Sequence, residues 1–104
     1  MTGKEENFGY FIRNHKDIAS AYEDFGKLVH TKGGPLDEKS RWLIKVAVST
    51  ASSHELALRT HIQKALKSGC TPAEIEHSIL LTASTTGFPT MMTGLMIFRD
   101  EIGE

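Results

Sequence analysis

The chain has 104 residues, which suits one compact domain and leaves little room for a second. Charged residues make up 24%, and the formal net charge of -1 gives no electrostatic reason to expect nucleic acid or an anionic membrane as a partner. No uninterrupted apolar run approaches the ~20 residues that a membrane-spanning helix needs.

The N-terminus and the cysteine content indicate the compartment. Residues 1–7 are polar and carry both charge signs, without the basic-then-apolar order of a secretory signal. The single cysteine, Cys70, excludes an intramolecular disulfide and a cysteine-rich metal site. We therefore expect a cytoplasmic protein.

The first third of the chain is predicted to contain an extended arm and one helix. Residues 1–12 form the arm, and its aromatic side chains are too apolar for a free tail, so we expect it to pack on the domain or on a neighbouring subunit. The helix covers about residues 15–30, where apolar side chains recur at steps of three and four and share one face. These side chains are Ile18, Ala21, Tyr22, Phe25, Leu28 and Val29.

A second helix is predicted from Asp37, a good N-cap, to about residue 51. It should turn Leu43, Val46, Ala47 and either Ile44 or Val48 inward. Residues 46–53 are rich in β-branched side chains, which also fits a strand. We favour the helix because no second strand candidate exists to pair with it.

Two cap signals delimit the next helices. Ser52 and Glu55 have the spacing of a capping box, so a third helix should start at Ser53 and end near residue 68, with Gly69 in the left-handed position after it. Thr71, Pro72 and Glu74 give a stronger start signal for a fourth helix, which should run to about residue 85.

The last helix is predicted over about residues 90–102, after a corner at Phe88-Pro89. It holds three of the four methionines, which we expect to fill gaps in the core or in subunit contacts. Five helices joined by short loops predict a compact all-α bundle.

Three motifs in the second half of the chain occur in a recognisable order. They are H-x-x-x-A-L-x-x-G at residues 61–69, T-P-x-E-I at residues 71–75 and A-x-x-x-G-x-P at residues 83–89. Their order and spacing resemble the carboxymuconolactone decarboxylase superfamily, which has the alkyl hydroperoxidase D-like fold. The resemblance implies an all-α subunit that assembles with its own copies into rings, commonly trimers or hexamers.

The alkyl hydroperoxidase D-like branch of that superfamily carries a C-x-x-C pair four residues ahead of a helix histidine. One thiolate attacks the oxidant and the other thiol resolves it as a disulfide. When that histidine is aligned with His61, the cysteine positions fall at His54 and Ala57, the branch's upstream acid at Trp42 and its extra histidine at Leu56. Because only His61 matches, a dithiol peroxidase mechanism is not supported.

The resemblance and the histidine spacing together give a first functional hypothesis. His54 and His61 are seven residues apart, which places them on nearly the same face of one helix. We predict that they are the catalytic residues, with His61 as general acid or base on a small carboxylic acid and Arg59 holding the substrate carboxylate. In a decarboxylase, His61 would protonate a carbanion-like carbon as carbon dioxide leaves. No organic cofactor is implied.

Other interpretations stay open. His61 could be a hydrogen-bonded structural histidine in an oligomeric domain that binds a ligand or a partner without turnover. Cys70 could have one-cysteine peroxidase activity, although a small residue in a turn is the simpler explanation. No metal site is predicted, because histidines seven apart are too distant for one ion unless His77, with Glu74 or Glu76, approaches them. Glu74 itself is expected to be structural, as the end of its capping box.

Overall fold

The computed structural model describes residues 3–104, which fold into six α-helices and one 3₁₀ turn, with no strand in this range. The backbone divides into two compact units, Met1–Pro35 and Leu36–Glu104, and each is described by itself. Whether they form one functional domain, as predicted, stays a prediction. No helix in the described part is long and apolar enough to cross a membrane.

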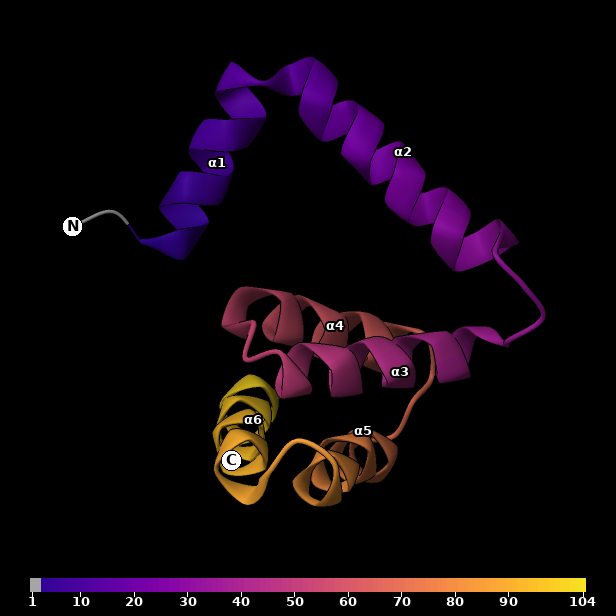
Figure 1. Cartoon of the computed structure of the whole chain (residues 1–104), viewed down its shortest axis with the longest axis vertical. Coiled ribbons are helices and arrows are strands. Elements are labelled where there is room, and N and C mark those ends of the chain that lie inside the picture. Colours follow the sequence, from indigo (N-terminus) through magenta and orange to yellow (C-terminus); the bar gives the residue numbers. More distant parts are fainter. Residues whose placement is uncertain (1–2) are drawn as a thin grey trace. The chain divides into compact units, whose positions relative to one another are not determined.

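The N-terminal unit is a pair of helices, α1 (Lys4–Asn14) and α2 (Lys16–Lys32), which meet at His15 (Figure 1). The extended arm expected over residues 1–12 is therefore wrong from residue 4 onward, and residues 1 and 2 lie outside the described part. Helix α1 is favoured by acidic residues in its first turn and by Arg13 in its last turn, because these charges complement the helix dipole. The rings of Phe11 and His15 stack at 5.8 Å and help to hold the turn.

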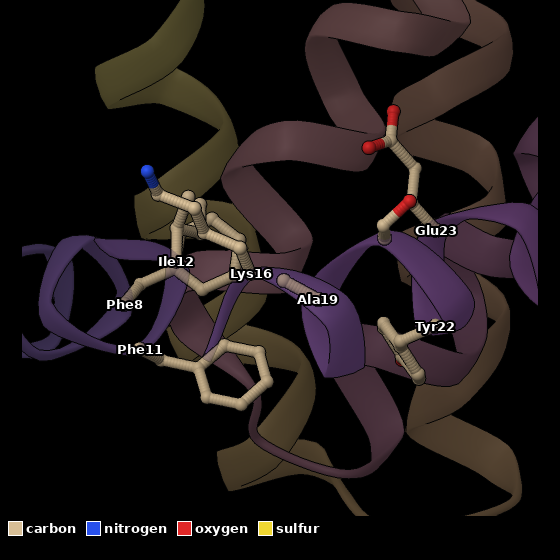
Figure 2. A pocket seen from close by; sticks show the side chains of 8 residues that line it. Phe8, Phe11, Ile12, Lys16, Ala19, Tyr22 and Glu23 are labelled. Atoms are coloured by element: carbon tan, nitrogen blue, oxygen red, sulfur yellow. The ribbon is translucent and has the colours of Figure 1, made fainter. Parts of the chain in front are cut away.

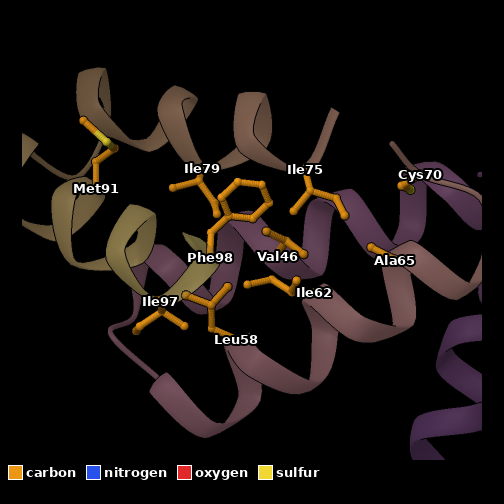
Figure 3. Packing of buried hydrophobic residues seen from close by; sticks show 10 residues of the cluster. All are labelled: Val46, Leu58, Ile62, Ala65, Cys70, Ile75, Ile79, Met91, Ile97 and Phe98. Carbon is orange, nitrogen blue, oxygen red and sulfur yellow. The ribbon is translucent and has the colours of Figure 1, made fainter. Parts of the chain in front are cut away.

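The C-terminal unit contains the remaining elements: α3 (Glu38–Ala51), α4 (Glu55–Lys67), α5 (Pro72–Leu80), the 3₁₀ turn η1 (Leu81–Ser84) and α6 (Phe88–Ile102). Helices α3 and α4 lie side by side, and α5 and α6 pack against α3 (Figure 1). Between them lies one apolar core, shown in Figure 3. Its members are Val46, Leu58, Ile62, Ala65, Cys70, Ile75, Ile79, Met91, Ile97 and Phe98.

Three cap predictions are confirmed. The Asp37 carboxylate accepts the Ser40 backbone N–H at 2.7 Å. Thr71 and Glu74 form a reciprocal capping box, with bonds of 3.1 and 2.8 Å. Gly69 has φ +96°, the left-handed region that favours glycine. Since α3 covers residues 46–51, the strand alternative is excluded there.

The predicted capping box at Ser52 and Glu55 is wrong. Ser52 instead closes α3, because both its backbone N–H and its hydroxyl donate to the Val48 carbonyl. Ser53 takes a left-handed φ of 58°, and His54 becomes the N-cap of α4. Because Ser52 forms its hydrogen bonds with the end of α3, α4 starts two residues later than predicted.

Other boundaries also differ from the expectation. Helix α5 stops at Leu80 and tightens into η1, so the fourth predicted helix is two elements. Helix α6 starts at Phe88 rather than at residue 90, because Pro89 fits the first turn of a helix, where no donor is needed. Among its methionines, Met91 is buried, whereas Met92 and Met96 are exposed.

Val46 is buried and Leu43 packs against the core, as predicted, but the rest of the buried face of α3 differs from the expectation. Neither Ile44 nor Val48 is buried, and the polar side chains of Ser49 and Thr50 are buried instead. Thr50 satisfies its hydroxyl on the Val46 carbonyl at 2.9 Å. It lies so close to α6 that a Cβ at Gly94 would be 2.5 Å from its Cγ2. A close helix contact, rather than apolar character alone, decides which side of α3 faces inward.

Candidate functional site

His61 lies on α4, half-buried, with its ring turned toward α3. Its Nδ1 is 2.7 Å from the Oγ of Ser49 and 3.3 Å from the carbonyl oxygen of Lys45. Ser49 is only 5% exposed, so the hydroxyl side of this contact is sheltered from bulk water. The imidazole therefore has a fixed orientation relative to α3.

The residues of α3 around this ring share one helix face. Trp42, Lys45 and Ser49 are separated by three and four residues, which places them on one side of α3. The Trp42 and His61 ring centroids are 5.9 Å apart, at an interplanar angle of 45°. Helix α3 thus surrounds the imidazole with an indole, a hydroxyl and a backbone carbonyl.

Two lysines approach the same indole. The Nζ of Lys45 is 4.8 Å from the centroid of the Trp42 ring, and the Nζ of Lys64 is 6.0 Å from it. Ammonium groups at this distance are attracted to the negative face of an aromatic ring. Because Trp42 also contacts His61, the two positive charges are held in the neighbourhood of the imidazole.

Burial lowers the pKa of His61 from its ordinary value of 6.5, and the positive charges of Lys45 and Lys64 lower it further. The hydrogen bond to the Lys45 carbonyl acts in the opposite direction. The pKa of Lys45 is lowered as well, first by its burial and then by the charge of Arg41. The net effect on His61 favours the uncharged form of its ring.

The tautomer of the neutral ring follows from its partners. A proton on Nδ1 of His61 satisfies both contacts, because the Lys45 carbonyl oxygen can only accept and the Ser49 hydroxyl can also accept. That proton is then shared with the Oγ of Ser49, and Nε2 carries the lone pair. In this tautomer His61 can accept a proton at Nε2 without losing its bonds to α3.

The family model described as "Carboxymuconolactone decarboxylase family" matches residues 16–100, which is most of the chain. The chain belongs to the carboxymuconolactone decarboxylase family. No curated protein and no solved structure matches it significantly. Membership is thus shown by the family pattern, and the chemistry has to be argued from the residues of this chain.

Trp42, which the sequence analysis aligned with the upstream acid of the alkyl hydroperoxidase D-like branch, lies against His61 in the structure. An indole cannot exchange a proton with the ring as a carboxylate does. Ser49 is the hydroxyl that contacts the ring here. The surroundings of His61 therefore differ from that branch in more than the missing thiols.

The other two predicted site residues lie elsewhere. His54 is the exposed N-cap of α4. Arg59 forms ion pairs with Glu55 at 3.3 Å, Asp100 at 3.2 Å and Glu101 at 3.0 Å, which tie α4 to the end of α6. Two residues on a helix are turned by about 200°, so Arg59 faces α6 while His61 faces α3. The structure does not bring Arg59 and His61 together.

Cys70 is a core residue, 4% exposed, and its thiol donates to the Lys39 carbonyl at 3.7 Å. Glu74 is engaged in its capping box and in an ion pair with Lys39, as expected of a structural residue. Among residues 3–104, no three histidine, cysteine or acidic side chains come close enough to hold one metal ion. His77 is exposed on α5.

A separate groove of about 390 Å³ lies between α1 and α2 of the N-terminal unit (Figure 2). Its walls are mostly apolar, and Lys16 and Glu23 contribute opposite charges. Its lining holds no imidazole and no thiol. The lining residues are Phe8, Phe11, Ile12, Lys16, Ala19, Ser20, Tyr22 and Glu23.

The sequence interpretation missed the residues that surround His61. Ser49 was predicted neither in the core nor in the site, and Trp42, Lys45 and Lys64 were not assigned to it. The signal was present in the spacing of Trp42, Lys45 and Ser49, which marks one face of α3. Only the packing of α3 on α4 shows that this face meets His61.

Proposed function

We propose that this chain is a decarboxylase-type enzyme that binds a small carboxylic acid beside His61 and uses the imidazole to move a proton. The observation that carries the proposal is the 2.7 Å contact between Ser49 Oγ and His61 Nδ1. It orients a half-buried, neutral ring whose second nitrogen is available for proton transfer. The family membership supports the same reaction class.

Two lysines near the ring favour an anionic substrate. Lys45 and Lys64 hold their ammonium groups near Trp42 and both lower the pKa of His61. A carboxylate between them would relieve their mutual repulsion and form charge-assisted hydrogen bonds. Trp42 would offer its ring face to the apolar part of the same acid. This proposal assigns substrate binding to the lysines; roles for Arg59 and His54 stay predictions from the sequence.

Substrate binding would also favour protonation of the His61 ring. A carboxylate placed near His61 favours the charged imidazolium, so the ring takes up a proton from water at Nε2. The bond between the substrate carbon and its carboxylate then breaks, carbon dioxide leaves, and the electron pair stays on carbon. The imidazolium protonates that carbon and returns to the neutral ring. The overall change is one carboxylate and one proton converted to carbon dioxide and a C–H bond.

The direct test measures carbon dioxide release from carboxymuconolactone by the purified chain. We expect His61→Gln to lower the rate by at least about 100-fold, the usual contribution of a positioned general acid. His77→Gln is the matched control, since it changes an exposed helix histidine that no step uses. No release by the wild-type chain, or equal rates in both variants, would contradict the proposal. If the wild-type chain binds benzoate without turnover, the ligand-binding alternative is favoured.

Two further expectations accompany this function. Members of the family are often oligomeric, and we propose that this chain also assembles with its own copies, as a trimer or a hexamer. A cytoplasmic location stays a prediction from the sequence. Peroxidase activity through Cys70 has no part in the proposal, because its thiol is buried and donates to a backbone carbonyl.

A further inference from the structure

Helix α2 carries an apolar stripe that its own unit does not cover. Four large side chains form this stripe, and each is more than half exposed: Ile18 60%, Tyr22 71%, Phe25 63% and Val29 53%. No residue of α1 or α2 is buried. Exposed aromatic and aliphatic side chains that line up in this way mark an interaction surface.

The stripe has the spacing of a helix–helix seam. Its members are separated by four, three and four residues, the alternation of the two core positions of a coiled coil. Charged side chains lie on the other side of the helix, where Glu23 and Lys27 form an ion pair at 3.5 Å. Helix α2 is thus divided into a polar face and an apolar face.

We propose that this stripe is a two-fold contact with the α2 stripe of a second copy of the chain, with the two helices antiparallel. The spacing of four, three and four is the same in both directions along the helix. An antiparallel copy therefore places Ile18 opposite Val29 and Tyr22 opposite Phe25, aliphatic against aliphatic and aromatic against aromatic. A two-fold contact uses the same patch on both copies, so such self-matching is what it requires.

The area of the stripe reaches the minimum for a biological contact. Covering the exposed parts of these four side chains and their neighbours in both copies would bury roughly 1,000 Å². That is about the minimum area expected of a biological protein–protein interface. Small residues flank the stripe at Ala21 and Gly26, and the space around Gly26 is open, so the helices can approach closely.

The inference depends on the self-association proposed above and is independent of the chemistry at His61. A two-fold contact requires an even number of subunits. Of the two predicted ring sizes it fits the hexamer, which contains two-fold axes, and not the trimer.

The test is disulfide trapping in the full chain on a Cys70→Ser background. Tyr22→Cys and Phe25→Cys are made as separate variants, one carrying a mass tag, and are mixed and mildly oxidised. We expect the mixed disulfide between positions 22 and 25 to exceed either same-position disulfide by at least about fivefold. Glu23→Cys mixed with Lys27→Cys is the matched control on the polar face, and it should give little product.

Sedimentation gives the second measurement. We expect the wild-type chain to have an even subunit number and Tyr22→Glu to halve the observed mass, while circular dichroism shows the helix content retained. The inference is overturned if the cysteine at position 22 instead forms its disulfide with Val48→Cys, an exposed position of α3. It is also overturned if the control positions react equally, or if Tyr22→Glu leaves the mass unchanged. A wild-type monomer would overturn both the contact and the proposed self-association, whereas an even oligomer without the 22–25 disulfide would overturn the contact alone.

Discussion

The Oγ of Ser49 lies 2.7 Å from the Nδ1 of His61, and this contact joins the middle of α3 to the middle of α4. It fixes the plane of the imidazole and leaves Nε2 as the nitrogen that can exchange a proton. Around it lie an indole and two lysines, and burial together with the lysine charges lowers the pKa of the ring.

Ser49→Ala should weaken both the fold and the activity. Removing the hydroxyl leaves Nδ1 of His61 with the longer 3.3 Å contact to the Lys45 carbonyl. We expect a loss of about 1 kcal/mol in the free energy of unfolding and a fall of about tenfold in carbon dioxide release. Ser52→Ala, at the exposed C-cap of the same helix, should leave the rate unchanged. Equal rates for the two variants would show that the contact has no role in the reaction.

The lowered pKa of His61 predicts a pH-dependent part of the stability. Between that pKa and the unfolded value of about 6.5, the unfolded chain binds more protons at this position than the folded chain. The stabilising contribution is therefore complete above pH 6.5 and declines as the pH falls toward the folded pKa. Urea midpoints of the wild-type chain and His61→Gln, measured across this range, should diverge as the pH rises to 6.5 and then stay parallel. A difference that is constant with pH would contradict the shift.

Lys64→Gln should raise the pKa of His61, because burial stays the first cause of the shift but one of the two positive charges is removed. The same variant should bind benzoate more weakly, by about three- to fivefold, since an exposed charge pair contributes up to about 1 kcal/mol. Isothermal titration calorimetry measures the affinity. Lys67→Gln removes a neighbouring exposed lysine of α4 and should change neither quantity. Equal effects of the two variants would indicate a nonspecific charge effect.

Gly94→Ala should destabilise the C-terminal unit by about 1–3 kcal/mol, because the new Cβ would lie 2.5 Å from Cγ2 of Thr50. Adding Thr50→Ser removes that methyl group and keeps the hydroxyl that bonds to Val46. We expect the double variant to recover much of the loss, which a double-mutant cycle by urea denaturation measures. Additive effects of the two changes would show that the close contact is not the cause.

Cap chemistry could be predicted from the sequence because it depends on a few adjacent residues. Asp37, Thr71 and Gly69 behave as expected for this reason. The end of α3 could not, since Ser52 has two local roles available, closing one helix or starting the next, and the backbone of the folded chain decides between them.

Burial was harder to predict than helix position. The apolar side chains of Ile44 and Val48 are exposed, whereas Ser49 is buried, because α3 is oriented by its close contact with α6 at Thr50 and Gly94. That orientation also creates the site, since it turns Ser49 toward His61. His61 could be singled out from its motif, but its partners come from a helix twelve or more residues away and become visible only through packing.

The most direct test of the account is the titration of the His61 ring by NMR, with and without saturating benzoate, using His61→Gln to assign its signal. We predict a pKa below 6.5 in the free chain, because the ring is half-buried and lies near two lysines, and a clear rise when the carboxylate binds. A pKa at or above 6.5 in the free chain, or one that benzoate does not change, would contradict a carboxylic acid site beside His61.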